Sequence, residues 1–186
     1  MQKFFSCCIG CLISMLFLTI LAVSGLALSG VATIPYLSKI LYKEPPKLPR
    51  PVYIDTIGLE ERILKDVTKK NIIILNEGEF SYLLKKATKE QKIESLKANI
   101  DANKILLLAE VKSGKILYLT FSLKPKDSPG NFQISGLKVG YLPLPIILFR
   151  TFLPSKGIIS IANIFPPGIN IKDVRLEDKK MFITLK

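Results

Sequence analysis

The hydrophobic pattern begins with a long uncharged stretch, which runs from Phe4 to Ser38. The hydrocarbon core of a bilayer needs about 20 apolar residues of helix, and residues 12–34 alone supply more than that. The hydrophobic region of a cleavable signal peptide has only about 7–15 residues. We therefore predict a single-pass transmembrane anchor of the signal-anchor type over residues 1–40, with cleavage near Ala27–Ser29 as the alternative.

A proline-rich segment follows the uncharged stretch. Four prolines lie between Glu44 and Pro51, and segments of this composition form extended, semi-rigid spacers. The pattern predicts a linker over residues 41–51 and a separate domain over residues 52–186.

The first part of that domain has the periodicity of short helices. Apolar residues recur on one face of residues 59–70 and again on one face of residues 80–87, which is the spacing of amphipathic helices. Between these two segments, residues 72–75 form a short apolar run that predicts a strand.

Two polar patterns predict helix starts. Asn76 and Glu79 fit a capping box at the beginning of the second helix, because an N-cap side chain and the third helical residue can satisfy each other's backbone amides. Thr88–Gln91 repeats the pattern, so we predict a further helical piece that ends near Ala98.

The remainder of the domain alternates as strands do. We predict a hairpin of Lys104–Lys112 and Lys115–Lys124, a strand at Phe132–Tyr141 with a bulge at Gly136, and a closing hairpin of Ile169–Leu176 and Met181–Leu185. Helices followed by a meander of strands indicate an α+β fold class, with two or three short helices packed on a curved antiparallel sheet.

The predicted strands carry apolar side chains on both faces. In residues 115–124, Leu117 and Leu119 lie on one face, while Ile116 and Tyr118 lie on the other. A sheet with one solvated face alternates cleanly. Either one face of this sheet curls around an apolar groove, or the strands are central in a filled two-layer core.

Two uncharged, proline-containing segments, residues 141–149 and 157–171, favour the groove. Exposed apolar patches of this kind mark contact with a membrane or a ligand. The candidate ligand-binding side chains for the groove come from the second helix, the strands and the first of these segments: Phe80, Leu83, Leu84, Leu117, Leu119, Phe121, Leu137, Val139, Leu144, Ile147 and Phe149.

The sequence contains few of the residue types that usually carry out catalysis. Histidine, the commonest general base and metal ligand, is absent, and the cysteines are confined to Cys7, Cys8 and Cys11. No phosphate-binding loop or metal-ligand spacing is present. We therefore expect a non-enzymatic protein without a metal or cofactor.

The net charge of the chain is +12, of which +8 belongs to residues 51–186. The lysines are scattered, with no aromatic-rich strand of the kind that binds single-stranded nucleic acid, so no nucleic acid partner is expected. Near a membrane, each basic residue is attracted to anionic headgroups by about 1 kcal/mol. Solubility alone is the alternative explanation of the charge.

Two short strings resemble a known family. The segments Leu75–Leu84 and Gly136–Pro145 are similar to uncharacterised single-pass bacterial envelope proteins of the YpmS-like type. The resemblance implies an exported, non-enzymatic domain whose curved sheet holds a lipid or a lipid-linked molecule. It supplies no catalytic motif.

Two features of the sequence favour opposite sides of the membrane for the domain. Lys39, Lys43, Lys47 and Arg50 follow the apolar stretch, which favours a cytoplasmic domain, whereas a very short N-terminal tail favours export. We expect export to the periplasmic or extracellular side.

The sequence predicts a domain that binds membrane lipids or another apolar ligand. The alternative is an envelope scaffold that docks a membrane protein partner without binding lipid.

Overall fold

A computed structural model of the protein describes residues 2–30, 46–88, 93–113, 115–149, 157–165 and 168–186, with the backbone alone for residues 2–13, 113, 115–116 and 148–149. The helices are α1 (Gln2–Ser29), α3 (Leu59–Lys69), α4 (Glu77–Ala87) and α5 (Ile146–Phe149), with a short 3-10 helix η2 (Ile161–Ile164). The strands are β1 (Ile72–Asn76), β2 (Ile93–Asp101), β3 (Lys104–Ser113), β4 (Lys115–Pro125), β5 (Asn131–Val139), β6 (Leu142–Leu144), β7 (Ile158–Ser160), β8 (Ile171–Glu177) and β9 (Lys180–Leu185).

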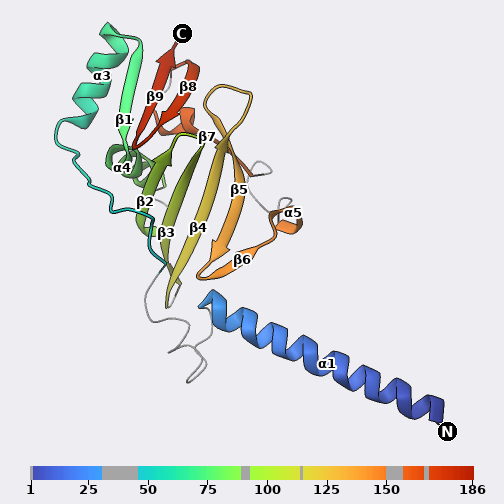
Figure 1. Cartoon of the computed structure of the whole chain (residues 1–186). Helices are drawn as coiled ribbons and strands as arrows, with labels where there is room; N and C mark the ends of the chain where they lie inside the picture. The colour runs from blue at the N-terminus through green and yellow to red at the C-terminus, as the bar shows by residue number, and fades with distance from the viewer. Residues whose placement is uncertain (1, 31–45, 89–92, 114, 150–156, 166–167) are drawn as a thin grey trace.

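The strands form two antiparallel sheets. The larger sheet is a meander in the order β2-β3-β4-β5-β6, with β7 paired to β5, and the smaller sheet has the order β1-β9-β8. Figure 1 shows α4 behind the larger sheet, α3 beside β1, and α1 projecting away from the opposite end. The predicted α+β architecture of short helices with antiparallel strands is confirmed, although the strands divide between two sheets where the sequence predicted one.

Most of the predicted local elements are confirmed. The capping box is complete, because Asn76 Oδ1 accepts a hydrogen bond from the Glu79 amide and Glu79 Oε2 accepts one from the Asn76 amide, both at 2.8 Å. The predicted bulge in β5 is also present. Ser122 pairs with Gly136 and Leu123 pairs with Ile134, so that one extra residue lies between them.

The predicted helical piece that ends near Ala98 is wrong. Residues 89–92 lie outside the described residues, and the chain from Ile93 onward is strand β2. Leu96, Ala98 and Ile100 lie on the same face of β2 and are all buried, which is the two-residue spacing of a strand. Pairing with β3 also supplies hydrogen-bond partners to the backbone, and this tertiary pairing prevails over a weak local capping signal.

One face of the larger sheet is a filled core. Phe80, Leu83 and Leu84 of α4 are buried in the same cluster as Leu107 and Ala109 of β3. We call this the helix face, and the opposite side the outer face. On the helix face, the filled two-layer core that the sequence offered as an alternative is what the structure has.

The outward edge of β2 is hydrogen-bonded by side chains rather than by another strand. Ser81 of α4 is buried, donates to the Glu77 carbonyl, and accepts a hydrogen bond of 2.9 Å from the Ala98 amide. An unpaired backbone group that is buried away from water is costly. Ser81 therefore both removes that cost and fixes α4 against the sheet.

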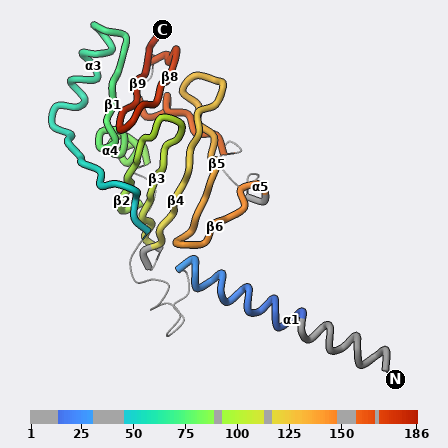
Figure 2. The backbone as a smooth tube through the Cα atoms, in the orientation of Figure 1, coloured from blue at the N-terminus to red at the C-terminus, as the bar shows by residue number. Residues whose placement is uncertain are grey.

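The last turn of α1 docks onto the domain, whereas its middle part does not. The Tyr141 amide, in the turn between β5 and β6, donates a hydrogen bond of 3.0 Å to the Leu28 carbonyl, and Ala27 is fully buried. Figure 2 shows the coloured part of α1 extending away from the sheets. Among the side chains that are described, which in α1 begin at Ser14, no helix is long and apolar enough to cross a membrane.

We expect Ser81→Ala to destabilise the protein, because it leaves the buried Ala98 amide without an acceptor. An unsatisfied buried donor costs about 1–3 kcal/mol, so the free energy of unfolding should fall by that amount. Urea denaturation of the full chain in detergent micelles, followed by circular dichroism, measures the change. Ser128→Ala in an exposed loop is the control and should change stability by less than about 0.5 kcal/mol. Equal stability of the two variants would contradict the role given to Ser81.

Candidate functional site

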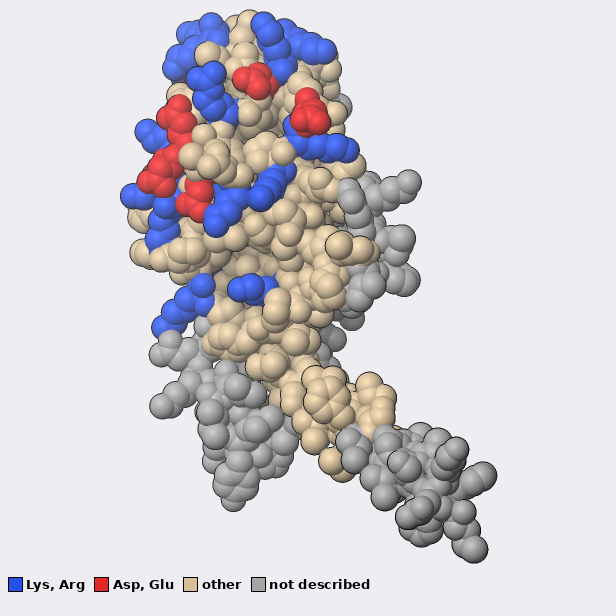
Figure 3. Space-filling view, turned by 45° about the vertical axis from the view of Figure 1, so that its right-hand side comes forward, with Lys and Arg blue, Asp and Glu red and all other residues tan. Residues whose placement is uncertain are grey.

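Charged side chains are unevenly distributed over the domain. In the view of Figure 3, acidic groups lie only in the part away from α1, where they are mixed with basic groups. The part of this face next to α1 is uncharged apart from a few basic side chains. On this face, the only charges near the end of the domain onto which α1 docks are therefore positive.

A cavity of about 560 Å³ lies on the outer face of the larger sheet, close to this end. It crosses β3, β4 and β5 and ends at β6 and α5. Its lining is mainly apolar, with three hydroxyl groups and two lysines: Lys47, Leu48, Pro49, Leu106, Leu108, Thr120, Ser122, Ser135, Gly136, Leu137, Lys138, Pro143, Leu144, Ile146 and Ile147. Pockets for small organic ligands usually have volumes of about 300–1,000 Å³ and a largely apolar lining.

The second wall of this cavity is the proline-rich segment that precedes the domain. We call residues 46–54 the strap. Lys47, Leu48 and Pro49 of the strap line the cavity described above and also a neighbouring cavity of about 440 Å³, which extends toward Glu110. Leu108 lines both cavities and is buried, although it is not part of the helix-face core. The described part of the predicted spacer thus lies against the sheet, where it covers an apolar side chain.

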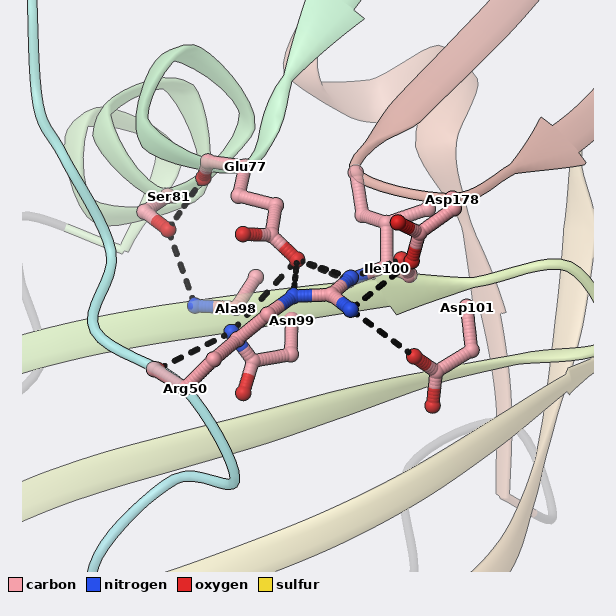
Figure 4. Close-up of polar contacts among 8 residues, drawn as sticks. All are labelled: Arg50, Glu77, Ser81, Ala98, Asn99, Ile100, Asp101 and Asp178. Atoms are coloured by element: carbon pink, nitrogen blue, oxygen red, sulfur yellow. Dashed lines mark hydrogen bonds and ion pairs between the residues drawn. The ribbon is translucent and has the colours of Figure 1, made fainter.

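Arg50 attaches the strap to the rest of the domain (Figure 4). Its guanidinium donates hydrogen bonds of 2.7 and 3.0 Å to Glu77 Oε1 and one of 2.7 Å to Asp178 Oδ1, and it also donates to the Ile100 carbonyl. Asp101 lies 3.5 Å away. Arg50 therefore joins four elements: the strap, the first turn of α4, the end of β2 and the β8–β9 turn.

Glu77 is the buried partner at this junction. The same oxygen that accepts from Arg50 also accepts a hydrogen bond of 2.8 Å from the Ile100 amide, so it satisfies another backbone group on the free edge of β2. Hydrogen bonding to Glu77 raises the pKa of the Arg50 guanidinium above its ordinary value. The stabilisation from a raised pKa is complete below the unfolded-state pKa, so the Arg50 charge contributes at every ordinary pH.

The strap also passes very close to the start of α4. A Cβ atom added to Gly78 would lie 1.8 Å from the Tyr53 carbonyl oxygen and 2.8 Å from the Ile54 Cα atom. Both contacts are far shorter than van der Waals separation. Only glycine therefore permits this approach, and any side chain at position 78 would displace the strap.

The side chains predicted for a groove fall into different environments. Phe80, Leu83 and Leu84 are buried in the helix-face core, and Leu83 also borders a separate cavity of about 400 Å³ between α3, α4 and η2. Four others are half-buried on the helix face of β4 and β5: Leu117, Leu119, Phe121 and Val139. Leu137, Leu144 and Ile147 are among the residues that border the outer-face cavity, although the strand register places Leu137 and Leu144 on the helix face of the sheet. The Phe149 side chain lies outside the described residues.

The structure thus brings only part of the predicted set to one place, and a ligand-contact role stays a prediction for all of it. The strap residues and the outer-face residues of β3 were not among the candidates. Their signal was present in the sequence as the second apolar face, which carries Leu106 and Leu108. Nothing in the local pattern indicated that the proline-rich segment would fold back over that face.

The chain matches no known family, no curated protein and no solved structure. The likeness to single-pass envelope proteins therefore stays a prediction. Within the described parts of the chain, no group of histidine, cysteine, aspartate or glutamate side chains is arranged to hold a metal ion.

We expect Arg50→Ala to detach the strap and destabilise the fold. Breaking a buried ion pair costs about 3–5 kcal/mol. Since the Arg50 side chain is 26% exposed, we expect the free energy of unfolding to fall by about 2–3 kcal/mol. Hydrogen exchange of the full chain should speed up at the strap amides and at Ile100. Arg175→Ala removes an exposed arginine from β8 and serves as the control. If both variants exchange alike at these amides, Arg50 does not hold the strap.

Proposed function

We propose that this protein is a non-catalytic, membrane-anchored module that binds a lipid in the outer-face cavity. The observation that carries the proposal is the position of the cavity. Strand β6 forms part of the cavity wall and is also the strand that α1 contacts at its docked end. A ligand in the cavity would therefore lie directly beside the end of the helix that we propose as the anchor.

The surface of α1 supports its role as the anchor. Its large apolar side chains between Met15 and Val23 are 47–68% exposed. A helix that is apolar on all sides is found in the core of a large protein or in a membrane, because exposing so much apolar surface to water is unfavourable. Insertion of α1 into a bilayer would remove this surface from water and place the docked end of the domain at the interface.

The short helix α5 supports contact with the bilayer or with a lipid leaving it. Ile147 is 89% exposed, while its neighbour Ile146 is half-buried, and both line the cavity. Isolated exposed apolar residues are common, but these two form the rim of an apolar cavity. A lipid that moves between the bilayer and the cavity would pass such a rim without full exposure to water. In this proposal the domain lies on the exported side of the membrane.

A second candidate function has its own observation. The loop that leads into α3 exposes Tyr53 by 80%, Ile54 by 50% and Ile57 by 96%. Exposed apolar groups close together in sequence can form a docking surface for a partner protein. In this alternative the protein is an envelope scaffold that binds a membrane protein, and the outer-face cavity holds no lipid.

We expect the full chain, released gently from detergent, to carry a lipid adduct in native mass spectrometry. Ser122→Trp should abolish or strongly reduce the adduct, because a large side chain on the outer face of β4 would fill the cavity. Gln133→Trp is the matched control, since it lies on the same face of β5 but does not line the cavity. A wild-type chain that carries no lipid, or an adduct that survives Ser122→Trp, would overturn the proposal and favour the scaffold.

A further inference from the structure

The smaller sheet has one covered edge and one uncovered edge. At the β1 edge, the Arg62 guanidinium donates a hydrogen bond of 3.2 Å to the Ile74 carbonyl, and an ion pair of 2.7 Å with the buried Glu79 holds Arg62 in place. Figure 1 shows α3 on the outer side of β1, with β8 at the opposite edge of this sheet. Within the described residues, β8 pairs with β9 alone, so no strand is paired with its other side.

The hydrogen bonds of β9 indicate which backbone groups of β8 face the uncovered edge. The Leu185 amide donates to the Asn71 carbonyl on the β1 side. Because bonding alternates from residue to residue along an antiparallel strand, the odd-numbered residues of β9 bond to β1 and the even-numbered ones to β8. Asp173 and Arg175 are paired with even-numbered residues of β9. The amide and carbonyl of Val174, which lies between them, therefore point to the uncovered edge.

The side chains on either side of Val174 have opposite charges. Asp173 and Arg175 are both exposed, and neither makes an ion pair in the part of the chain that the structure describes. They lie on the same face of β8, because they are two residues apart. If a second copy of β8 paired antiparallel about a two-fold axis at Val174, Asp173 of each copy would lie directly opposite Arg175 of the other. Opposite charges in such cross-strand positions stabilise the pairing.

The same charges disfavour the neighbouring registers. A shift of two residues, which keeps bonding groups opposite each other, places Asp173 against Asp173 or Arg175 against Arg175. Like charges directly opposite destabilise a strand pair. A shift of one residue places Val174 opposite a residue whose backbone groups already bond to β9, so no ladder forms. The charge pattern therefore favours one antiparallel register.

We propose that two copies of this chain associate through β8, centred on Val174, into one continuous sheet in the order β1-β9-β8-β8-β9-β1. An uncovered edge strand is a template for pairing with another chain, and charged side chains on it discourage pairing with arbitrary strands. A second copy supplies the complementary pattern, and a two-fold contact covers the edge of both copies at once. The irregularity between Ile171 and Asp173 keeps the ladder short, so we expect the dimer to depend on protein concentration. The inference is independent of lipid binding.

Sedimentation velocity of the full chain in density-matched detergent micelles, at increasing protein concentration, tests the association. We expect the wild-type chain to dimerise. Asp173→Arg alone or Arg175→Asp alone should weaken the dimer at least about ten-fold, because each change places like charges opposite each other twice. A mixture of the two single variants should form a heterodimer of about wild-type affinity, because every opposed pair then has opposite charges.

The control is Glu61→Arg, which makes the same change in net charge at an exposed position of α3 and should leave the dimer unchanged. A wild-type chain that stays monomeric would overturn the proposal and leave the β8 edge to a strand of another protein. A dimer that survives both single variants would also overturn it, since the copies would then associate elsewhere. Folded, monomeric single variants that do not associate when mixed would overturn the antiparallel register.

Discussion

The arrangement of this domain depends on the free edge of β2. An edge strand exposes a row of backbone amides and carbonyls that require partners. Here Ser81 accepts from the Ala98 amide, Glu77 accepts from the Ile100 amide, and Arg50 and the Lys179 amide donate to the Ile100 carbonyl. These partners come from α4, the strap and the β8–β9 turn. Satisfying one strand edge therefore joins the helix, the strap and the smaller sheet to the larger sheet.

The contacts at this edge also determine which elements cover the two faces of the larger sheet. Because α4 is held on one side by Ser81 and Glu77, its apolar side chains fill the helix face with a core. Because Arg50 holds the strap on the other side, the strap covers Leu108 and bounds a cavity instead of a close-packed layer. The same buried carboxylate, Glu77, takes part in both attachments. A filled core and an open cavity thus occupy opposite faces of one sheet.

The features around the outer-face cavity are the reason to expect that it binds a ligand. It adjoins the docked end of an apolar helix, it has an exposed apolar rim at Ile147, and its charged lining residues are lysines. Each of these features has an ordinary explanation by itself, since isolated apolar residues and excess lysines are common on protein surfaces. Their combination in one place is what an amphiphile from a bilayer requires.

The sequence alone determined the elements whose signals are local. The capping box at Asn76, the amphipathic stripe of α4, the bulge beside Gly136 and the closing hairpin each depend on residues within about fifteen positions of one another. The tertiary structure decided what depends on distant partners. Residues 93–98 become a strand because β3 is available to pair with them, and β1 joins a separate sheet because β9, about 100 residues later, pairs with it. The strap becomes a cavity wall because Arg50 meets Glu77 and Asp178, and no local pattern records contacts between residues so far apart.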